Sequence, residues 1–395
     1  MEEKFASRMD GLQASAIREI LKFTADPSVI SFAAGNPAPE AFPVDAIREI
    51  TANILATNPI GALQYSITEG YMPLRDAVKA DLKKRHNIGT ENDELIITAG
   101  AQQAIDLTCK VLCDPGDAIL CENPSFIGTL NAFRSYQAEL VGVELESDGI
   151  NIEKLESAIR NHPNAKMLYV IPNFQNPAGV TMSLEKRRAV YEICLKNHIM
   201  ILEDNPYGEL RYAGKDIPTI KSMDTEGIVC YFGSFSKVLA PGLRVGYLCA
   251  PKEVAQKVVI VKQVNDVHSN ILAQMICNDF MARYDFEAHI AGLREIYRKK
   301  SGLMLENMRR CLNPKVTWVE PEGGLFMWCR LPDGVNMMEF CKKAVVNKVA
   351  VVPGTAFMPT EEDRTQCFRV NYSTPTDEQI VRGVEILGEL THEII

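Results

Sequence analysis

The amino-acid sequence predicts an α/β fold, a three-layer α/β/α sandwich with a mostly parallel mixed sheet, joined to a smaller α+β domain. Between residues 94 and 250, short apolar runs alternate with segments of helical period, which is typical of parallel strands connected by helices. The chain of 395 residues is longer than one hydrophobic core usually supports, so a second domain is expected. From about residue 285 the alternation ends, and a long charged helix precedes shorter strands.

Short runs that are rich in apolar and β-branched residues and bounded by turn residues are predicted to be the strands of the large sheet. They are residues 94–100, 117–122, 138–145, 165–172, 199–205, 228–234 and 244–250. Helices are predicted between several of them, including residues 102–112 and 184–197. In the C-terminal part, strands are expected at residues 316–321, 323–331, 349–354 and 368–373.

The first 45 or so residues are expected to hold one short helix and an extended, proline-rich segment that packs against the C-terminal part. This gives three units: an N-terminal helix and arm over residues 1–45, a large domain over 46–285 and a small C-terminal domain over 286–395. The sequence has no internal repeat, low-complexity tract or flexible linker to separate them further.

Composition restricts the class of function. The formal net charge of −9 at pH 7 disfavours nucleic acid and anionic membranes as partners, because both would select a basic face. We find no signal peptide and no apolar run of bilayer length, and the eleven scattered cysteines suit a reducing compartment, so a cytoplasmic protein is expected. Cys109 and Cys113 are close in sequence, but their helical spacing favours core packing over metal binding, and no metal site is expected.

The stretch SFSKVLAPGLRVGY, residues 234–247, carries the strongest chemical signal. Lys237 follows a buried strand, where a charged amine is costly unless it is paired or used in chemistry. An isolated lysine would be expected to extend its amine to water. Here Ser234, Ser236 and Arg244 accompany it, and two hydroxyls with a guanidinium are the groups that a phosphate-bearing carbonyl cofactor needs.

Polar residues also follow other strands, at the edge where open α/β sheets bind ligands. The turn Gly100-Ala101-Gln102 opens a helix and offers N–H groups to an anion, although small residues at such turns are more often structural. Asp204 ends a strand and, taken alone, would be a turn or helix-capping residue. Asn176, which precedes a proline, would by itself be a turn signal.

Taken together, the motifs NPAG, DNPYGEL, SFSK with APGLRVGY, and FRVNYS make nearly the whole chain resemble the class I/II aminotransferases, which use pyridoxal 5'-phosphate and have fold type I. The stretches SAIREILKF and ISFAAGNPAPEAFP resemble the branch of 2-aminoadipate and kynurenine/aminoadipate aminotransferases. The resemblance implies the fold of pyridoxal-phosphate-dependent transferases, with the cofactor bound by the large domain, and a homodimer with shared active sites.

The resemblance also implies roles around the cofactor ring. Lys237 would form an aldimine with the cofactor and, once the substrate displaces it, carry the proton between the substrate α-carbon and the cofactor carbon C4′. Asp204 would lie beside the ring nitrogen and keep it protonated. Asn176 and Tyr207 would bond the phenolic oxygen. Phe126 would lie against the ring face, the alternative being an ordinary core phenylalanine.

The phosphate would be held by the residues of two turns, namely Ser234, Ser236, Arg244 and, in the turn that Gly100 begins, the amides of Ala101 and Gln102. Tyr65, in LQYSITEG, matches a tyrosine that reaches the phosphate of the neighbouring subunit. If so, each active site takes a residue from both subunits.

Other matched residues would bind the substrate. Arg369 would grip the α-carboxylate through two parallel hydrogen bonds, beside Asn176, whereas a lone arginine in an edge strand would be solvated. Gly35 would let the backbone approach that carboxylate, or be a plain turn glycine. Arg18, with Ser15 before it, would contact a distal carboxylate, or be an exposed helix arginine paired with a glutamate.

We therefore expect an aminotransferase that moves the amino group of an L-amino acid, of 2-aminoadipate, aromatic or branched-chain type, to a 2-oxo acid such as 2-oxoglutarate. A β-lyase or decarboxylase on the same scaffold is one alternative, since the same residues would hold the cofactor. A non-catalytic effector-sensing domain, as in some transcription regulators, is the other. The acidic charge and the lack of a preceding segment of winged-helix size disfavour it.

Overall fold

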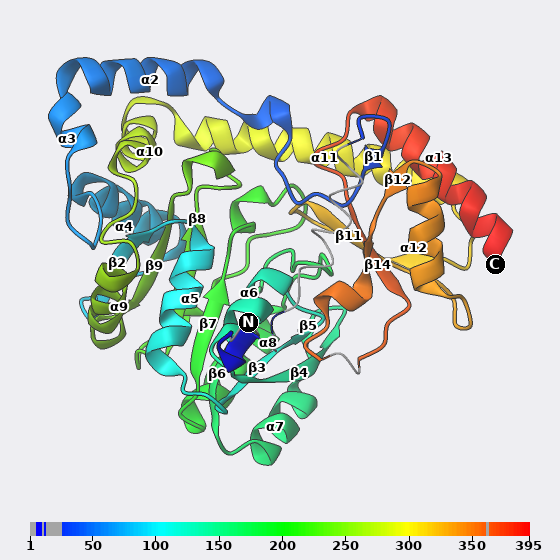
Figure 1. Ribbon diagram of the computed structural model, residues 1–395, viewed down its shortest axis with the longest axis horizontal. Helices are drawn as coiled ribbons and strands as arrows, with labels where there is room; N and C mark the ends of the chain where they lie inside the picture. Colours follow the sequence, from blue (N-terminus) through cyan, green and yellow to red (C-terminus); the bar gives the residue numbers. More distant parts are fainter. Residues whose placement is uncertain (1–4, 10–11, 13–25, 361–362) are drawn as a thin grey trace.

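An eight-stranded mixed sheet with strand order β2-β9-β8-β7-β6-β3-β4-β5 forms the centre of the large unit (Figure 1). The computed structural model describes residues 5–9, 12, 26–360 and 363–395. The strands are β2 (Asp93–Thr98), β3 (Ala118–Asn123), β4 (Glu139–Glu146), β5 (Gly149–Ile150), β6 (Ala165–Val170), β7 (Met200–Asp204), β8 (Val229–Ser234) and β9 (Gly246–Pro251). β9 is antiparallel to both neighbours and β5 to β4, whereas the other pairs are parallel.

Two helical layers cover this sheet, because successive residues of its apolar strands point to opposite faces. One face packs against α5 (Ala101–Leu112), α6 (Ile127–Ser135) and α9 (Lys252–Asn265). The other packs against α7 (Ile152–Asn161) and α8 (Leu184–Lys196). In β6, for example, Tyr169 belongs to the first core and Leu168 to the second. The predicted sandwich with its mostly parallel mixed sheet is confirmed.

A group of helices packs at the β2 end of the sheet (Figure 1). They are α2 (Val44–Thr57), α3 (Pro59–Leu63), α4 (Met72–His86) and α10 (Ile271–Arg283). The long helix α11 (Phe286–Cys311) extends from this group to the C-terminal part, where it packs along α13 (Asp377–Ile394). It therefore connects the two ends of the molecule.

The C-terminal part contains an antiparallel sheet of order β10-β11-β14-β13, with α12 (Met337–Val346) beside it. Its strands are β10 (Thr317–Trp318), β11 (Phe326–Arg330), β13 (Val352–Pro353) and β14 (Cys367–Asn371). β14 has β11 on one side and β13 on the other, so Arg369 lies in an interior strand rather than an edge strand. The sequence predicts a strand at residues 349–354 but could not show that it pairs beside β14, because the order of strands in a sheet is a tertiary property.

The N-terminal arm makes contacts with both parts. β1 (Ile30–Ser31) pairs in parallel with β12 (Val349–Ala350), and the Phe32 carbonyl accepts a hydrogen bond from the Asn371 amide at 2.8 Å. The short helix η1 (Ser7–Met9), in contrast, contacts α6 of the large unit. The predicted helix that contains SAIRE falls outside the described residues.

Single 3₁₀ turns complete the fold: η2 (Pro39–Ala41), η3 (Gly208–Leu210), η4 (Lys221–Met223), η5 (Pro241–Leu243) and η6 (Gly354–Phe357). Of the helices in the described ranges, none combines the length and the apolar character that crossing a membrane requires.

Candidate active site

A cavity of about 380 Å³ opens beyond the carboxyl ends of the central strands. Its lining brings together most of the residues predicted for the site, from parts of the chain as distant as residues 35 and 369. The lining residues are Gly35, Asn36, Ala101, Gln102, Ile105, Phe126, Ile171, Asn176, Asp204, Pro206, Tyr207, Ser234, Ser236, Lys237, Arg244, Phe326 and Arg369. Gly100 is adjacent to the lining, Tyr65 is outside it, and Arg18 and Ser15 lie outside the described residues.

Lys237 lies just after β8, where the buried strand carries its side chain into the cavity. Its Nζ donates to the backbone oxygen of Gly35 at 2.7 Å. Burial, reinforced by the positive charges of Arg369 and Arg244, lowers the pKa of Lys237 to about 8. A neutral amine is therefore accessible at far lower pH than for an exposed lysine.

Asp204 is the last residue of β7 and is buried. Its Oδ2 accepts a hydrogen bond from the hydroxyl of Tyr169 at 2.7 Å, whereas its buried Oδ1 has no partner among the described residues. Burial raises the pKa of Asp204 to about 7, although the bond from Tyr169 acts to lower it. A carboxylate with one open oxygen beside a cavity can accept a hydrogen bond from a protonated ring nitrogen.

Arg369, Asn176 and Tyr207 form one hydrogen-bonded group. Arg369 donates from Nη1 to Asn176 Oδ1 at 2.8 Å and from Nη2 to the carbonyl of Ala33 at 2.8 Å. Asn176 Nδ2 donates to the Tyr207 hydroxyl at 3.4 Å. The guanidinium lies 4.2 Å from the centre of the Phe326 ring. Its Nε has no partner among the described residues, and burial lowers the pKa of Arg369 to about 10, so an anion bound there would stabilise the guanidinium.

A glycine turn lies where α5 begins. Gly100 has φ +82°, a backbone conformation that residues with a side chain rarely adopt, and a Cβ there would also displace Nη2 of Arg244, which is 2.4 Å away. Gly100 has no side chain to cap the helix, so among the described residues the first backbone N–H groups of α5 stay open to an anion. Arg244 Nη1 reaches the Ser236 hydroxyl at 3.4 Å, and Ser234 Oγ accepts from the Ser236 amide at 3.0 Å.

Two predicted aromatic residues have different surroundings. Phe126 directly precedes α6 and is half-buried in the cavity lining, so one side of its ring is available. Tyr65 is 82% exposed and contacts only the edge of His268 among the described aromatic rings, with 5.9 Å between ring centres. In its own subunit Tyr65 does not line the cavity.

Sequence reasoning missed several residues of the site. Tyr169 donates a hydrogen bond to Asp204, and the ring of Phe326 packs against the guanidinium of Arg369. Pro206 and Ile171 are apolar residues of the cavity lining. A signal existed for Tyr169, because a tyrosine in a fully buried strand needs a partner for its hydroxyl. For Phe326 there was none, since core phenylalanines give the same pattern.

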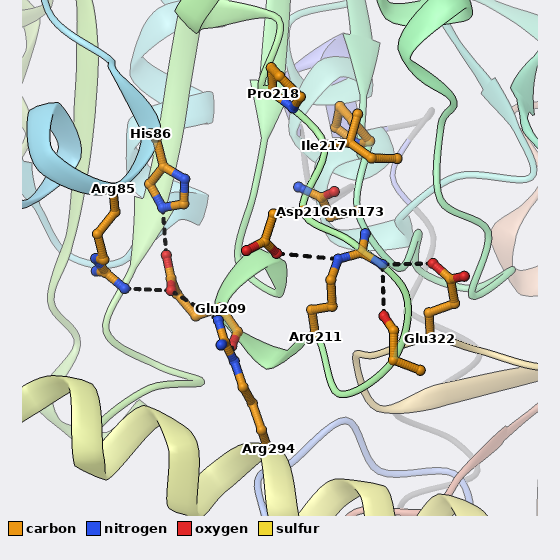
Figure 2. Close-up of polar contacts among 12 residues, drawn as sticks. Arg85, His86, Asn173, Glu209, Arg211, Asp216, Ile217, Pro218, Arg294 and Glu322 are labelled. Atoms are coloured by element: carbon orange, nitrogen blue, oxygen red, sulfur yellow. Dashed lines mark hydrogen bonds and ion pairs between the residues drawn. The ribbon is translucent and has the colours of Figure 1, made fainter.

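Ion pairs of Glu209 and Arg211 attach the segment that follows Asp204, residues 205–211, to other parts of the fold (Figure 2). Glu209 pairs with Arg85, lies 2.7 Å from His86 Nε2, and is 3.9 Å from Arg294, whose Nε also donates to the Glu209 carbonyl at 2.7 Å. Arg211 pairs with Glu322 at 2.6 Å. The segment is thereby attached to α4, to α11 and to the loop before β11.

The fold and the residues of the cavity together indicate an enzyme of amino-group chemistry. Comparison with known proteins agrees: the family described as aminotransferase class I and II matches residues 27–387. The chain belongs to this family and is an aminotransferase. The predicted family is confirmed.

Relatives similar over their whole length support this assignment. Aromatic-amino-acid aminotransferase 1 of Thermococcus litoralis is 39% identical over 396 residues, covering 99% of this chain and 95% of that protein. The 2-aminoadipate transaminase of Thermus thermophilus is 37% identical over 390 residues, covering 98% and 96%. The crystal structure of Pyrococcus horikoshii kynurenine aminotransferase matches with a TM-score of 0.95 at 35% identity, covering 98% and 97%.

Proposed function

We propose that this aminotransferase moves the amino group of a 2-aminoadipate, aromatic or branched-chain L-amino acid to a 2-oxo acid, 2-oxoglutarate being the expected acceptor. One observation carries the proposal: a single cavity holds the amine of Lys237, the open oxygen of Asp204 and the guanidinium of Arg369. These groups suit a substrate that brings both an amino group and a carboxylate.

Pyridoxal 5'-phosphate is the cofactor, and the residues present fit it. Oδ1 of Asp204, which has no partner in the part of the chain that the structure describes, suits the ring N–H, and the open end of α5 with Arg244 suits the phosphate. When bound, this cofactor supplies an aldehyde for the substrate amine and a ring that accepts electrons. Ser234 and Ser236 would complete the phosphate site.

The chain's own residues divide the remaining work. Lys237, with its lowered pKa, would take the proton from the substrate α-carbon and deliver it to the cofactor carbon that carries the aldehyde. Asp204 would keep the ring nitrogen protonated, and Asn176 and Tyr207 would bond the phenolic oxygen. Arg369 would hold the α-carboxylate, because its guanidinium is buried and its Nε has no partner among the described residues.

The class of donor follows from the lining. Its described cations are Lys237, Arg244 and Arg369, and each already has a function in the reaction. A distal carboxylate would therefore need a further cation, for which Arg18 is the candidate. Apolar donors would contact side chains such as Ile171 and Phe326. The names of the relatives, which include aromatic, 2-aminoadipate and kynurenine aminotransferases, support both donor types.

A homodimer is part of the proposal. Large apolar side chains of one short segment are exposed, at 49–82%: Ile60, Leu63, Tyr65, Ile67 and Met72. Monomers rarely expose such a group, and burial against a second copy would cover it. Tyr65 would then reach the phosphate of the partner's site. We also propose a cytoplasmic location, which the free state of all eleven cysteines supports.

The test is a panel of amino donors with 2-oxoglutarate, with glutamate formation as the readout. We expect glutamate from aromatic or branched-chain donors and from 2-aminoadipate, with a yellow, cofactor-containing protein. A coloured protein that forms glutamate from no donor, but releases pyruvate, ammonia or carbon dioxide, would favour the lyase or decarboxylase. A colourless protein that binds no pyridoxal phosphate would overturn the proposal.

A further inference from the structure

Asp204 offers one oxygen to the cavity because the other is already held. Tyr169 donates to Oδ2 at 2.7 Å, and Oδ1 is left as the open acceptor. The two residues come from neighbouring strands, β6 and β7, and point to the same face of the sheet, since Tyr169 pairs with Leu202, two residues before Asp204. The contact is therefore set by the register of the sheet.

Tyr169 is itself fixed from the helical layer. Its hydroxyl accepts a hydrogen bond from Thr129 of α6 at 3.1 Å, and both side chains are fully buried. Phe133, one turn further along α6, meets the Tyr169 ring edge-on with 5.7 Å between centres. The Tyr169 ring is thus held by packing and its hydroxyl by a second donor.

The direction of these bonds is determined by chemistry. Burial and the neighbouring charge of Asp204 raise the pKa of Tyr169 well above its ordinary value, so the phenol keeps its proton and acts as the donor to the carboxylate. Because the single hydroxyl proton of Tyr169 is used for Asp204, its oxygen must act as the acceptor for Thr129. The result is a chain of donors, Thr129 to Tyr169 to Asp204, that ends at the cavity.

We propose that Tyr169, supported by Thr129, is a positioning residue that orients Asp204 and stabilises its ionised form toward the cofactor ring nitrogen. This inference rests on the proposed function, because it assigns Oδ1 to that nitrogen. Loss of the phenol would leave Oδ2 buried without a donor, which favours protonation or rotation of the carboxyl group. The ring nitrogen would then lose its proton more easily.

The test uses the holoenzyme with cofactor labelled with ¹⁵N in the ring. In Tyr169→Phe we expect the ¹⁵N chemical shift to move toward the unprotonated nitrogen, and the cofactor Kd to rise roughly 3- to 10-fold. Thr129→Val should give a smaller change in the same direction. Tyr297→Phe is the matched control, since it removes another buried hydroxyl, one that accepts from the Ala38 amide, and it should change neither quantity.

A double-mutant cycle isolates the coupling. In an Asp204→Asn background, Tyr169→Phe should have little further effect on the ¹⁵N shift or the Kd, because the residue it acts through is neutral. An unchanged ¹⁵N shift in Tyr169→Phe, or equal effects with and without Asp204, would overturn the inference. If Tyr169→Phe does not fold, an unchanged shift in Thr129→Val would overturn it. Failure of the unaltered protein to bind the cofactor would instead overturn the proposed function.

Discussion

At the scale of single residues, Lys237 illustrates how surroundings prepare a side chain for chemistry. The cavity removes water from the amine, and Arg369 and Arg244 add positive charge nearby, so that its pKa falls to about 8. Neither arginine is near Lys237 for this reason alone, since each has an anion to bind in the proposed reaction. The same charges that would bind substrate and phosphate therefore favour the neutral amine.

The pH dependence of this amine can be measured. The neutral form is the nucleophile, so its reaction with an aldehyde should increase as pH rises through the pKa. We expect the initial rate of covalent capture of pyridoxal by cofactor-free protein to rise with a midpoint near pH 8. Pyridoxal is chosen because it lacks the phosphate that would offset Arg244. Lys237→Ala should show no such capture, and a midpoint near that of exposed lysine, about 10.4, would contradict the assignment.

Site residues that belong to a recognisable sequence motif could be predicted from the sequence. Site residues that contribute through their packing in the folded protein could not. Asp204 ends β7, Lys237 follows β8 and Arg369 lies within β14, each in a recognisable stretch of sequence, and all three line the cavity. Tyr169 lies within a strand, and its contact with Asp204 depends on the register of β6 against β7. Register is a property of paired strands, and a single strand's sequence does not contain it.

At the scale of elements, the segment from β7 through η3 is a rigid support for the site. Glu209 lies only two residues after Tyr207, and its carboxylate is surrounded by Arg85, His86 and Arg294 (Figure 2). Burial alone would raise the pKa of Glu209, but the hydrogen bond from His86 and the charge of Arg85 outweigh it and lower the pKa. The folded protein therefore stabilises the ionised form of Glu209.

Glu209→Gln should destabilise the protein by roughly 2–3 kcal/mol, because it leaves partly buried cations without their anion. Since the pKa of Glu209 is lowered in the fold, the contribution is complete above the ordinary value of 4.5 and is lost as pH falls through the folded pKa. Urea unfolding at pH 7 and pH 4 measures both effects. Glu287→Gln, whose partner Lys84 is 71% exposed, is the control and should change stability little.

The pair Arg211–Glu322 attaches the same segment to the loop before β11. Arg211 also stacks on Phe174, at 4.8 Å from the ring centre, and β11 begins with Phe326, which lies under Arg369. Glu322→Gln should loosen this attachment and raise KM for the amino acid roughly 3- to 10-fold, with a smaller change in kcat. Steady-state kinetics measure the effects on KM and on kcat separately. Glu320 lies in the same loop and forms an exposed pair with Arg309 of α11, so Glu320→Gln is the control and should leave KM unchanged. Equal effects of the two substitutions would refute a specific function for Glu322.

The elements themselves were largely predictable, because long apolar strands and amphipathic helices repeat their pattern over many residues. The strands of the large sheet lie where the sequence placed them, apart from β5. β1 and β5 have two residues each, too few for any periodicity. Their pairing with β12 and β4 comes from the tertiary structure alone.

At the scale of the whole molecule, the division into units at residues 45 and 285 stays a prediction. α11 begins at Phe286, directly after its capping residue Asp285, and continues for 26 residues along both parts. Arg294 contacts η3 of the large unit, whereas Lys299 pairs with Asp377 at the start of α13. The two parts of the molecule thus meet on the same helix, within two turns of one another.

Shared active sites can be tested by subunit mixing. In the proposed dimer, each site combines Lys237 of one subunit with Tyr65 of the other. A dimer of one Lys237→Ala subunit and one Tyr65→Phe subunit would therefore contain one site with both native residues and one site with neither. We expect mixed samples to exceed the activity of the averaged homodimers, measured after subunit exchange is verified by mass. Strictly additive activity would assign Tyr65 to its own subunit. Met338→Ala, at another exposed apolar position, is the control and should not complement Lys237→Ala.

The hydrogen bonds that close the cavity have a consequence for folding kinetics. Lys237 meets Gly35 across 202 residues, and Arg369 meets Asn176 across 193 and Ala33 across 336. Each contact closes a very long loop, so its entropic cost must be met after more local structure has formed. The residues that line the site range from Gly35 to Arg369, so no short fragment of the chain can contain it. We therefore expect activity to appear only after the large sheet and the C-terminal strands have folded together.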